Sequence, residues 1–471
     1  MLVAAACSQK SVIQHPAPPI EPLVLQRLSA KPWTAAERRV LQRDLRAIFS
    51  AAPAADASLC MFSQNGEALF EQRAAHAVTP ASTQKVVVAA AALHTLGPDF
   101  RYHTRLGESG NDIWLIGSGD PVLTSHDLRL GAKALVARGV RAVQGGVAVD
   151  ASAMGGPERN PLWASDDLNY GFSAPTSAIS LDQDTVEFHV KPTVPGAPAT
   201  IRLEPPNHVV SYTGAITTAP RGFYTNLAID PGQHPNSFVV SGRIAAGTEQ
   251  IFWRPVAGVP SYVAQVFEAM LEASGIRTAK NPRLGVAPSD VAVRWDHASP
   301  PLRTIVAKML FESNNHVAEQ LLRTLGKTEA GMGDDLHGLS AETTYLKALG
   351  IPLSGLHLVD ASGLAEQNRV SAMTMAALLA RLAVLPEGRS MYFALPRAGI
   401  DGTLKYYDFG AARGRARVKS GHLSGANSLA GYITTHKHGR VAFAFIVNDA
   451  AVSSSAIDDM LTRAVDRVAE L

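Results

Sequence analysis

The sequence predicts an α/β (α+β) protein in which an antiparallel sheet covered by helices is assembled from both ends of the chain. Each end encodes a β-hairpin and a helix. The middle, from about Tyr102 to Pro282, instead holds short strands broken by Gly, Pro and Asn, which indicates β-rich inserted material. A chain of 471 residues is too long for one ordinary core, so we expect two or three domains.

The composition is that of a folded globular protein, with 46% hydrophobic and 18% charged residues. The net charge is only +2, and no basic cluster carries interleaved aromatic residues, so no nucleic acid partner is expected. The two cysteines, Cys7 and Cys60, make neither a disulfide framework nor a zinc site. The 15 histidines show no ligand spacing beyond His436 and His438, which favour a solvated turn, so we predict no metal and no cofactor.

The chain begins with MLVAAACSQKSV, in which AAAC resembles the end of a bacterial lipoprotein signal with Cys7 as the lipidated residue. Only six residues precede Cys7, and none of them is charged. Two interpretations stay open: the true start lies upstream and Cys7 anchors the protein to a membrane, or the likeness is accidental. HPAPPIEPL follows as a proline-rich linker. No run of about 18 apolar residues predicts a membrane-spanning helix.

The first elements are a helix and a hairpin. TAAERRVLQRDLRAIFSAA predicts a helix with a capping box of Thr34 and Glu37. SLCMFSQNGEALFEQ predicts a β-hairpin that turns at Asn65-Gly66. The buried stripe of the helix is expected to comprise Val40, Leu41, Leu45, Ile48 and Phe49.

TPASTQKVVVAAAALHTLGP, residues 79–98, predicts a buried helix that starts after Pro80 and stops at Gly97-Pro98. Lys85 directly precedes eight apolar residues, so its ammonium must lie in or beside a desolvated site. Ser82 and Lys85 share one helix face. A first-turn serine with an amine in reach and free N–H groups beside it has the ingredients of an acyl-transfer nucleophile. The alternative is an ordinary helix N-cap with a lysine that extends toward solvent.

The later elements follow the same reasoning. Five strands are predicted in the middle, within DIWLIGSG, GGVAVDAS, DTVEFHVKP, ATIRLEPP and HPNSFVVSGRI, and SYVAQVFEAMLEASG is the one convincing helix there. Near the end, SLAGYITTHKHGRVAFAFIVND predicts a second hairpin that turns near His438-Gly439. A closing helix is expected from about Ser454 to Leu471.

Two further stretches supply what a serine nucleophile needs. KMLFESNNHVAEQLLRTLG places Ser313 and Asn315 just before a helix, and RARVKSGHLSGANSLAGY places Lys419 at the end of a short strand. With Ser82 and Lys85 they match the S-x-x-K, S-x-N and K-[ST]-G motifs of penicillin-recognising serine enzymes. S-x-N occurs three times in the chain, but motif order and helix context select Ser313. Neither G-x-S-x-G nor H-E-x-x-H is present, and GKT lacks the upstream glycine of a phosphate loop.

With these motifs the chain resembles the D-alanyl-D-alanine carboxypeptidase/endopeptidases of the penicillin-binding protein 4 type, which carry a large insertion. The separations agree, with 231 residues from Ser82 to Ser313 and 106 from Ser313 to Lys419, whereas a class A β-lactamase has a much shorter first gap. The resemblance implies a transpeptidase-like catalytic domain of residues 1–101 and 284–471, with residues 1–33 as an N-terminal linker or signal remnant. It also implies two nested insert domains, residues 102–175 with 256–283, and residues 176–255. Other family-like stretches are GSGDPVLT, FSAPTSAISLDQDTV, DASGLAEQNRVS, AGIDGTL and LSGANSLAGY.

The resemblance implies that Ser82 attacks the carbonyl of the penultimate D-Ala while a neutral Lys85 takes its proton. The pKa of a free lysine is near 10.4, so burial and the nearby Lys419 must lower it by about 2 to 3 units. By the same resemblance Ser313 relays the proton to the leaving amine. Asn315 holds the substrate backbone and hydrogen-bonds Lys85.

The third motif is expected to bind the substrate. Lys419 and Ser420 contact the terminal carboxylate, followed by Gly421. The oxyanion lies between the backbone N–H groups of Ser82 and His422. His422 departs from the family, which usually has Thr or Ser there, so side-chain help with the substrate is in doubt.

A side-chain pocket of the family, which reads the free end of a diaminopimelate residue, maps to less regular positions. Asp167 is the acid that meets the amino group, Phe172 the aromatic wall and Ser424 a further wall residue. The basic residue that pairs with the side-chain carboxylate maps to Glu366, which repels a carboxylate. The neighbouring Arg369 would compensate only if its longer side chain reaches back. The alternative for Asp167 is a loop cap.

The implied partners are peptidoglycan peptides ending in D-Ala and β-lactams that acylate Ser82, in a periplasmic or other extracytoplasmic location. No glutamate with a deacylating water is evident, so the β-lactam adduct is expected to persist. Two rival functions stay open, a β-lactamase and a non-catalytic cell-wall binding or scaffold protein.

Overall fold

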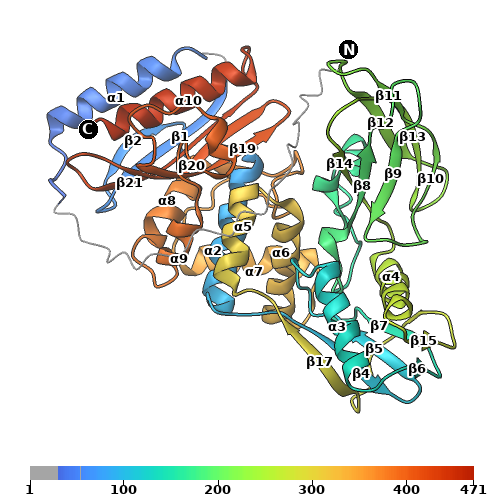
Figure 1. Ribbon diagram of the computed structural model, residues 1–471. Helices are drawn as coiled ribbons and strands as arrows, with labels where there is room; N and C mark the ends of the chain where they lie inside the picture. Colours follow the sequence, from blue (N-terminus) through green and yellow to red (C-terminus); the bar gives the residue numbers. More distant parts are fainter. Residues whose placement is uncertain (1–29, 53–54) are drawn as a thin grey trace.

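A five-stranded antiparallel sheet, in the order β19-β20-β21-β1-β2, lies toward one end of the computed structural model, at the upper left of Figure 1; the model describes residues 30–52 and 55–471. β1 pairs with β21 from Asp56 opposite Asn448 to Ser63 opposite Val441. The predicted assembly of one sheet from both chain ends is therefore confirmed, whereas the predictions for Cys7 and the proline-rich linker lie outside the described residues. The strands are β1 (Asp56–Ser63), β2 (Ala68–Gln72), β19 (Ala416–Leu423), β20 (Ala426–Thr434) and β21 (Arg440–Asn448).

Both predicted hairpins are present in this sheet. β1 and β2 join through Asn65-Gly66, and β20 and β21 join just before Arg440. Gly66 and Gly439 have φ of 82° and 73°, a left-handed conformation that glycine adopts without a steric penalty. The turn residues therefore set where each pair of strands reverses.

Helices cover both faces of the sheet (Figure 1). α1 (Ala35–Phe49) and α10 (Ser454–Ala469) pack together on one face, and α8 (Ala372–Leu382) packs on the other, against β1, β20 and β21. Successive residues of β1 point to opposite faces of the sheet. Met61 therefore packs on the side of α1 and α10, and Cys60 packs on the side of α8. The predicted capping box of α1 is confirmed, and Leu41, Leu45 and Phe49 are buried whereas Val40 and Ile48 are half-buried.

Residues 79–98 form a buried helix as predicted, but it begins with the tight turn η1 (Ala81–Gln84) before α2 (Lys85–Leu96). Every residue from Lys85 to Leu93 is buried, and the helix ends at Gly97 with φ of 83°. α2 is enclosed because five helices pack around it. They are α5 (Leu302–Glu312), α6 (Asn315–Ala330), α7 (Asp335–Ala348), α8 and α9 (Gly388–Ala394).

Residues 103–298 form a second body beside the first, here called the insert lobe (Figure 1). One mixed sheet has the order β16-β7-β5-β4-β17. Two helices, α3 (Ser125–Ala137) and α4 (Val259–Ala273), pack against it. Its strands are β4 (His103–Ser109), β5 (Asp112–Ile116), β7 (Val147–Asp150), β16 (Arg283–Leu284) and β17 (Ala292–Ala298). The division into domains stays a prediction, although β17, which it assigned to the catalytic domain, pairs with β4 here.

Two smaller sheets complete the β-rich part of the insert lobe. One is β14-β8-β9, with β8 (Thr185–Lys191), β9 (Thr200–Glu204) and β14 (Gln250–Pro255). The other groups β10 (Ser211–Gly214), β11 (Thr217–Ala219) and β12 (Asn226–Pro231) around β13 (Ser237–Ala245). Short pairs join β6 (Ala142–Val143) to β15 (Arg277–Thr278), and β3 (Ala77–Val78) to β18 (Val370–Ser371). All five predicted strands and the predicted helix are present, but α3 was missed.

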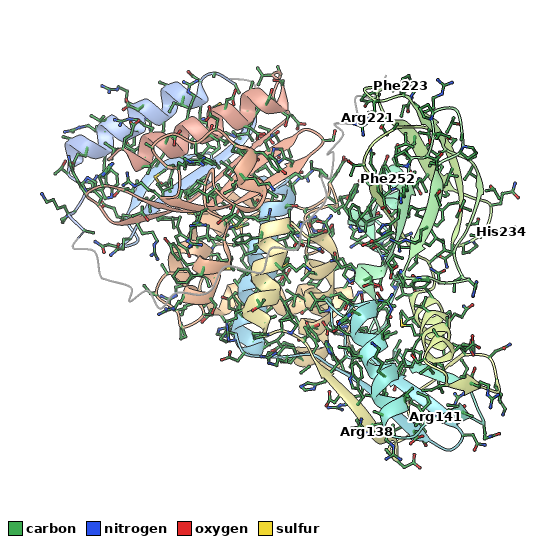
Figure 2. All side chains as sticks on the ribbon, viewed as in Figure 1. Arg138, Arg141, Arg221, Phe223, His234 and Phe252 are labelled. Atoms are coloured by element: carbon green, nitrogen blue, oxygen red, sulfur yellow. The ribbon has the colours of Figure 1, made fainter. Side chains whose placement is uncertain are left out.

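The insert lobe is elongated. Arg221 and Phe223 lie at one end of it, and Arg138 and Arg141 lie at the other (Figure 2). In the described ranges, no helix combines the length and apolar character needed to cross a membrane.

Candidate active site

Ser82 and Lys85 are in direct contact at the start of α2. The Lys85 amine lies 2.8 Å from Ser82 Oγ. It also donates to Asn315 Oδ1 at 2.6 Å and to the Ser362 carbonyl oxygen at 2.7 Å. Lys85 is fully buried whereas Ser82 is half-buried, so the amine has left water but the serine keeps some access to the surface.

The environment of Lys85 makes it a weak base. Burial lowers its pKa to about 7, against the opposing charges of Asp360 and Glu319. The expected contribution of Lys419 is not what produces this shift, because Lys419 is itself buried and its own pKa is lowered well below the ordinary value by burial and by the charge of Lys85. A neutral amine is therefore available near neutral pH.

Ser313 and Asn315 occupy the junction between α5 and α6. Ser313 ends α5 in a left-handed conformation, with φ of 56° and ψ of 39°. Asn314 then caps α6 by accepting from the Val317 N–H. Asn315, the first residue of α6, turns its oxygen to Lys85 while its Nδ2 donates to the Phe172 carbonyl at 2.9 Å. The left-handed conformation of Ser313 costs a non-glycine residue about 1 kcal/mol or more, so the surrounding packing must hold the junction in place.

The third motif joins the second through Lys419. From β19, its Nζ donates to Ser313 Oγ at 2.9 Å and to the carbonyl of Ser420. The Ser420 hydroxyl in turn shares a hydrogen bond of 2.8 Å with Thr403. The three motifs, far apart in the sequence, thus meet in one cluster, with Lys85 touching the second motif and the second motif touching Lys419.

Gly421 and His422 occupy different environments on β19. A Cβ on Gly421 would lie 2.4 Å from Ser428 Oγ and 2.9 Å from the Ser82 nitrogen, so only glycine lets β19 lie against η1. His422 is exposed, and its Nε2 lies 2.9 Å from the carboxylate of Asp458 on α10. The His422 side chain therefore already has a partner in Asp458.

The predicted pocket residues are only partly brought together. Ser424, Glu366 and Arg369 line one cavity of about 340 Å³. Burial, and then the charges of Asp166 and Glu366, raise the pKa of Asp167, so Asp167 lies close enough to sense Glu366. The Arg369 guanidinium donates to Thr79 Oγ1 at 2.9 Å and to the carbonyl oxygens of Glu366 and Asn368.

Phe172 stands apart from that cavity lining. Its ring is 45% exposed and stacks on Tyr170 with 5.4 Å between ring centroids. Its backbone carbonyl, however, reaches Asn315. Across the described ranges, no group of three or more His, Cys, Asp or Glu side chains could hold a metal ion.

Sequence reasoning assigned Glu366 of the loop at 359–368 to the side-chain pocket, but it missed the contact of this loop with Lys85. Its Ser362 carbonyl contacts Lys85, and Asp360 accepts from the N–H groups of Gly363 and Ala365 at 2.8 and 2.7 Å. Glu319 accepts from the Ser362 N–H at 2.8 Å. A backbone carbonyl leaves no mark in the side-chain pattern, but Glu319 lies one helical turn after Asn315 on the same face of α6, and that spacing was an available signal.

This fold and this cluster define the class of the protein as a serine peptidase with a penicillin-recognising fold. The chain belongs to the D-Ala-D-Ala carboxypeptidase 3 (S13) family, whose model matches residues 44–467. It is accordingly an enzyme, a serine D-Ala-D-Ala peptidase, which confirms the predicted family and activity.

Individual relatives agree with this assignment. The chain is 31% identical to a D-alanyl-D-alanine carboxypeptidase of Actinomadura sp. (strain R39) over 407 residues, 81% of this chain and 76% of that one. The fold is similar to that of penicillin-binding protein 4 from Haemophilus influenzae, with a TM-score of 0.79, 23% identity, and coverage of 91% of this chain and 100% of that one. A complex of that protein with a β-lactam gives a TM-score of 0.75 at 22% identity, with the same coverage.

Proposed function

We propose that Ser82 is the nucleophile of this D-Ala-D-Ala peptidase and that Lys85, as the neutral amine, is its general base. The observation that carries this proposal is the set of contacts of the Lys85 amine. Two of its three neighbours, Asn315 Oδ1 and the Ser362 carbonyl, can only accept hydrogen bonds. A neutral amine has two N–H groups and one lone pair, so the lone pair is left for the Ser82 hydroxyl 2.8 Å away.

The remaining motif residues complete the reaction. Ser313, hydrogen-bonded to Lys419, returns the proton to the leaving amine. Lys419 and Ser420 bind the terminal carboxylate beside Gly421, on β19 at the edge of the sheet. The N–H groups of Ser82 and His422 receive the oxyanion, and the loss of one such donor costs on the order of a hundredfold in rate.

The substrates we propose are peptidoglycan stem peptides and cross-links that end in a free D-Ala. The support is the family together with the buried Lys419, whose amine donates to Ser313. β-Lactams resemble that peptide end and would acylate Ser82; the support is that the Haemophilus influenzae protein forms a complex with a β-lactam. Such substrates lie outside the cytoplasm, so we place the enzyme in the periplasm or at the outer surface, with Cys7 as a candidate lipid anchor.

The decisive experiment is covalent labelling with a fluorescent penicillin. Wild type is expected to label, whereas Ser82→Ala and Lys85→Ala each lose labelling and keep the fold, because the apolar part of α2 supplies its packing. Ser261→Ala and Lys133→Ala, exposed positions of the insert lobe, are matched controls that should label as wild type. Labelling of Lys85→Ala at the wild-type rate would show that the base is wrongly assigned. Rapid turnover of nitrocefin would instead favour a β-lactamase.

A further inference from the structure

Two oxygens direct the Lys85 amine, and one of them is a backbone carbonyl, that of Ser362. When Lys85 gives up a proton, its two N–H groups are directed by Asn315 Oδ1 and by the Ser362 carbonyl. The Asn315 oxygen is fixed because its Nδ2 is already committed to the Phe172 carbonyl. The Ser362 carbonyl belongs to a loop and therefore needs support of its own.

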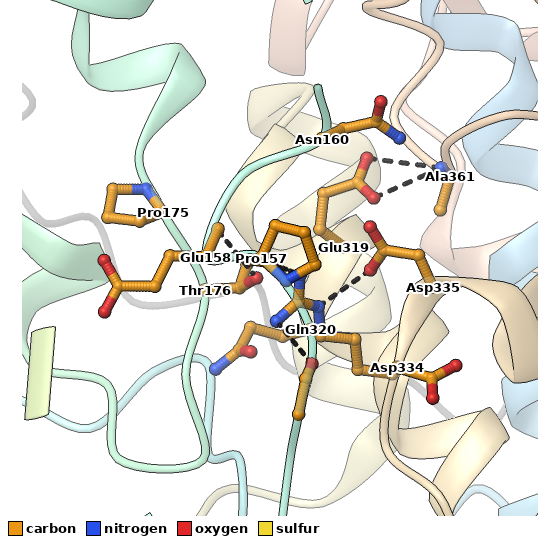
Figure 3. Close-up of polar contacts among 12 residues, drawn as sticks. Pro157, Glu158, Asn160, Pro175, Thr176, Glu319, Gln320, Asp334, Asp335 and Ala361 are labelled. Atoms are coloured by element: carbon orange, nitrogen blue, oxygen red, sulfur yellow. Dashed lines mark hydrogen bonds and ion pairs between the residues drawn. The ribbon is translucent and has the colours of Figure 1, made fainter. Parts of the chain in front are cut away.

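Glu319 supplies part of that support from α6, beside Asp360, which accepts from the Gly363 N–H of the same peptide unit as the Ser362 carbonyl. Its Oε1 accepts from the backbone N–H of Ser362 at 2.8 Å and from that of Ala361 at 3.2 Å. Figure 3 shows the carboxylate of Glu319 directed at Ala361. Glu319 is only 3% exposed, and it lies one helical turn after Asn315. One face of α6 thus sets both carbonyl oxygens that direct the Lys85 amine, one through Asn315 itself and one through Glu319.

We infer that Glu319 is a positioning residue for acylation: by holding the Ala361 and Ser362 N–H groups, it fixes the Ser362 carbonyl so that the Lys85 lone pair points only at the Ser82 hydroxyl. This inference rests on the proposed function, in which Lys85 is the general base. Glu319 touches neither the substrate nor the reacting atoms.

The role depends on an oxygen acceptor and not on a full negative charge. Burial raises the pKa of Glu319 to about 8, and Oε1 accepts in either form when the proton is on Oε2. Glu342 on α7 offers a contrast within the same buried acidic group. It is fully buried, yet neither of its carboxyl oxygens has a hydrogen-bond partner.

The test compares Glu319→Leu, Glu319→Gln and the matched control Glu342→Leu, all assayed with a fluorescent penicillin. The rate constant of acylation and the dissociation constant of the initial non-covalent complex are measured separately. Glu319→Leu is expected to lower the rate constant by about a hundredfold with the dissociation constant within about twofold, because a misplaced base slows chemistry without weakening binding. Glu319→Gln retains an oxygen acceptor and should restore most of the rate. Glu342→Leu should match wild type in both constants.

The outcomes separate this inference from the proposed function. A wild-type protein that no penicillin acylates overturns both. An acylated wild type together with an unchanged rate constant in Glu319→Leu, or equal losses in Glu319→Leu and Glu342→Leu, overturns the positioning role alone. If Glu319→Leu does not fold, Glu319→Asp replaces it, since it withdraws the carboxylate by one methylene and should slow acylation by about tenfold. A wild-type rate in Glu319→Asp then overturns the inference.

Discussion

In the proposed mechanism, the buried amine of Lys85 determines how the acylation rate depends on pH. Lys85 can take the Ser82 proton only when it is neutral, and burial lowers its pKa to about 7. Below that pH the ammonium form predominates and has no lone pair, so the acylation rate constant should fall about tenfold for each unit of pH. The rate should rise through pH 7 to a plateau. Stopped-flow acylation between pH 5 and 9 measures it, and a flat profile would contradict the assignment of Lys85.

Glu366 occupies the position at which the resemblance implies a basic residue. The nearby Arg369 directs its guanidinium at Thr79 and at backbone carbonyls, and the same cavity is also lined by Asp56 and Asp449, so acidic side chains outnumber it there. Asp167 senses the charge of Glu366, so the pocket is acidic. We predict a weak preference for a free diaminopimelate carboxylate and good tolerance of amidated or cationic side chains.

Matched peptides with free and amidated diaminopimelate test this prediction through kcat/KM. We expect the two values to agree within about threefold, since a like charge near the substrate carboxylate removes its advantage. Glu366→Gln should raise the value for the free acid and leave the amide unchanged. A strong preference for the free acid that Arg369→Ala abolishes would show that Arg369 has taken over the basic role.

Among the elements, those with local signals were predictable. Asn65-Gly66 fixes a hairpin through its own conformational preference, and the capping box of α1 lies within four residues. α3 was missed although Thr124 and Asp127 cap it, because Gly131 weakens the helical pattern. The reason for that glycine is tertiary, since a Cβ there would lie 2.6 Å from Leu106. Likewise the proposed catalytic side chains follow from motifs, whereas the Ser362 carbonyl meets Lys85 through a long-range contact that no motif marks.

The first turn of α6 is held by the insert lobe, and His316 reports on that contact. Its Nδ1 donates to the Pro175 carbonyl at 3.0 Å, so its Nε2 accepts from the Ser180 hydroxyl at 2.9 Å. This is the neutral tautomer, and burial lowers the pKa of His316 to about 4. Asp184 lies 4.0 Å away, but burial raises its pKa well above the ordinary value, so it offers little charge to stabilise an imidazolium.

His316 should therefore make the fold acid-sensitive. The unfolded histidine binds a proton near pH 6.5 and the folded one only near pH 4, so stability falls as pH drops through that interval. The loss attributable to His316 is about 3 kcal/mol. His316→Gln should unfold with a shallower pH dependence than wild type, measured by denaturant titration at pH 4, 5, 6 and 7. Parallel curves for the two proteins would contradict this account.

At the scale of the whole molecule, the insert lobe is part of the active site's support. Phe172 contributes its carbonyl to Asn315, and Gln183 accepts a hydrogen bond from Asn314. On the opposite side of the site, Trp163 Nε1 donates to Asp360 at 3.0 Å. The sequence could place these residues in inserted material. It could not show that they contact the α5–α6 junction and the loop at 359–368, because such contacts depend on how the two bodies pack together.

Two tryptophans of the insert lobe allow that support to be measured. Trp163→Phe and Trp253→Phe are the same substitution, and each removes one indole N–H donated to a carboxylate, Asp360 for Trp163 and Glu187 for Trp253. Only Asp360 belongs to the loop that carries the Ser362 carbonyl. Trp163→Phe should slow penicillin acylation by about tenfold, because small displacements of a catalytic loop are costly, whereas Trp253→Phe should stay within about twofold of wild type. Each variant is expected to lose about 1 to 3 kcal/mol of stability, so unfolding measured beside the acylation rate separates the two effects. Equal acylation rates in the two variants would mean that the insert lobe does not support the catalytic loop through Trp163.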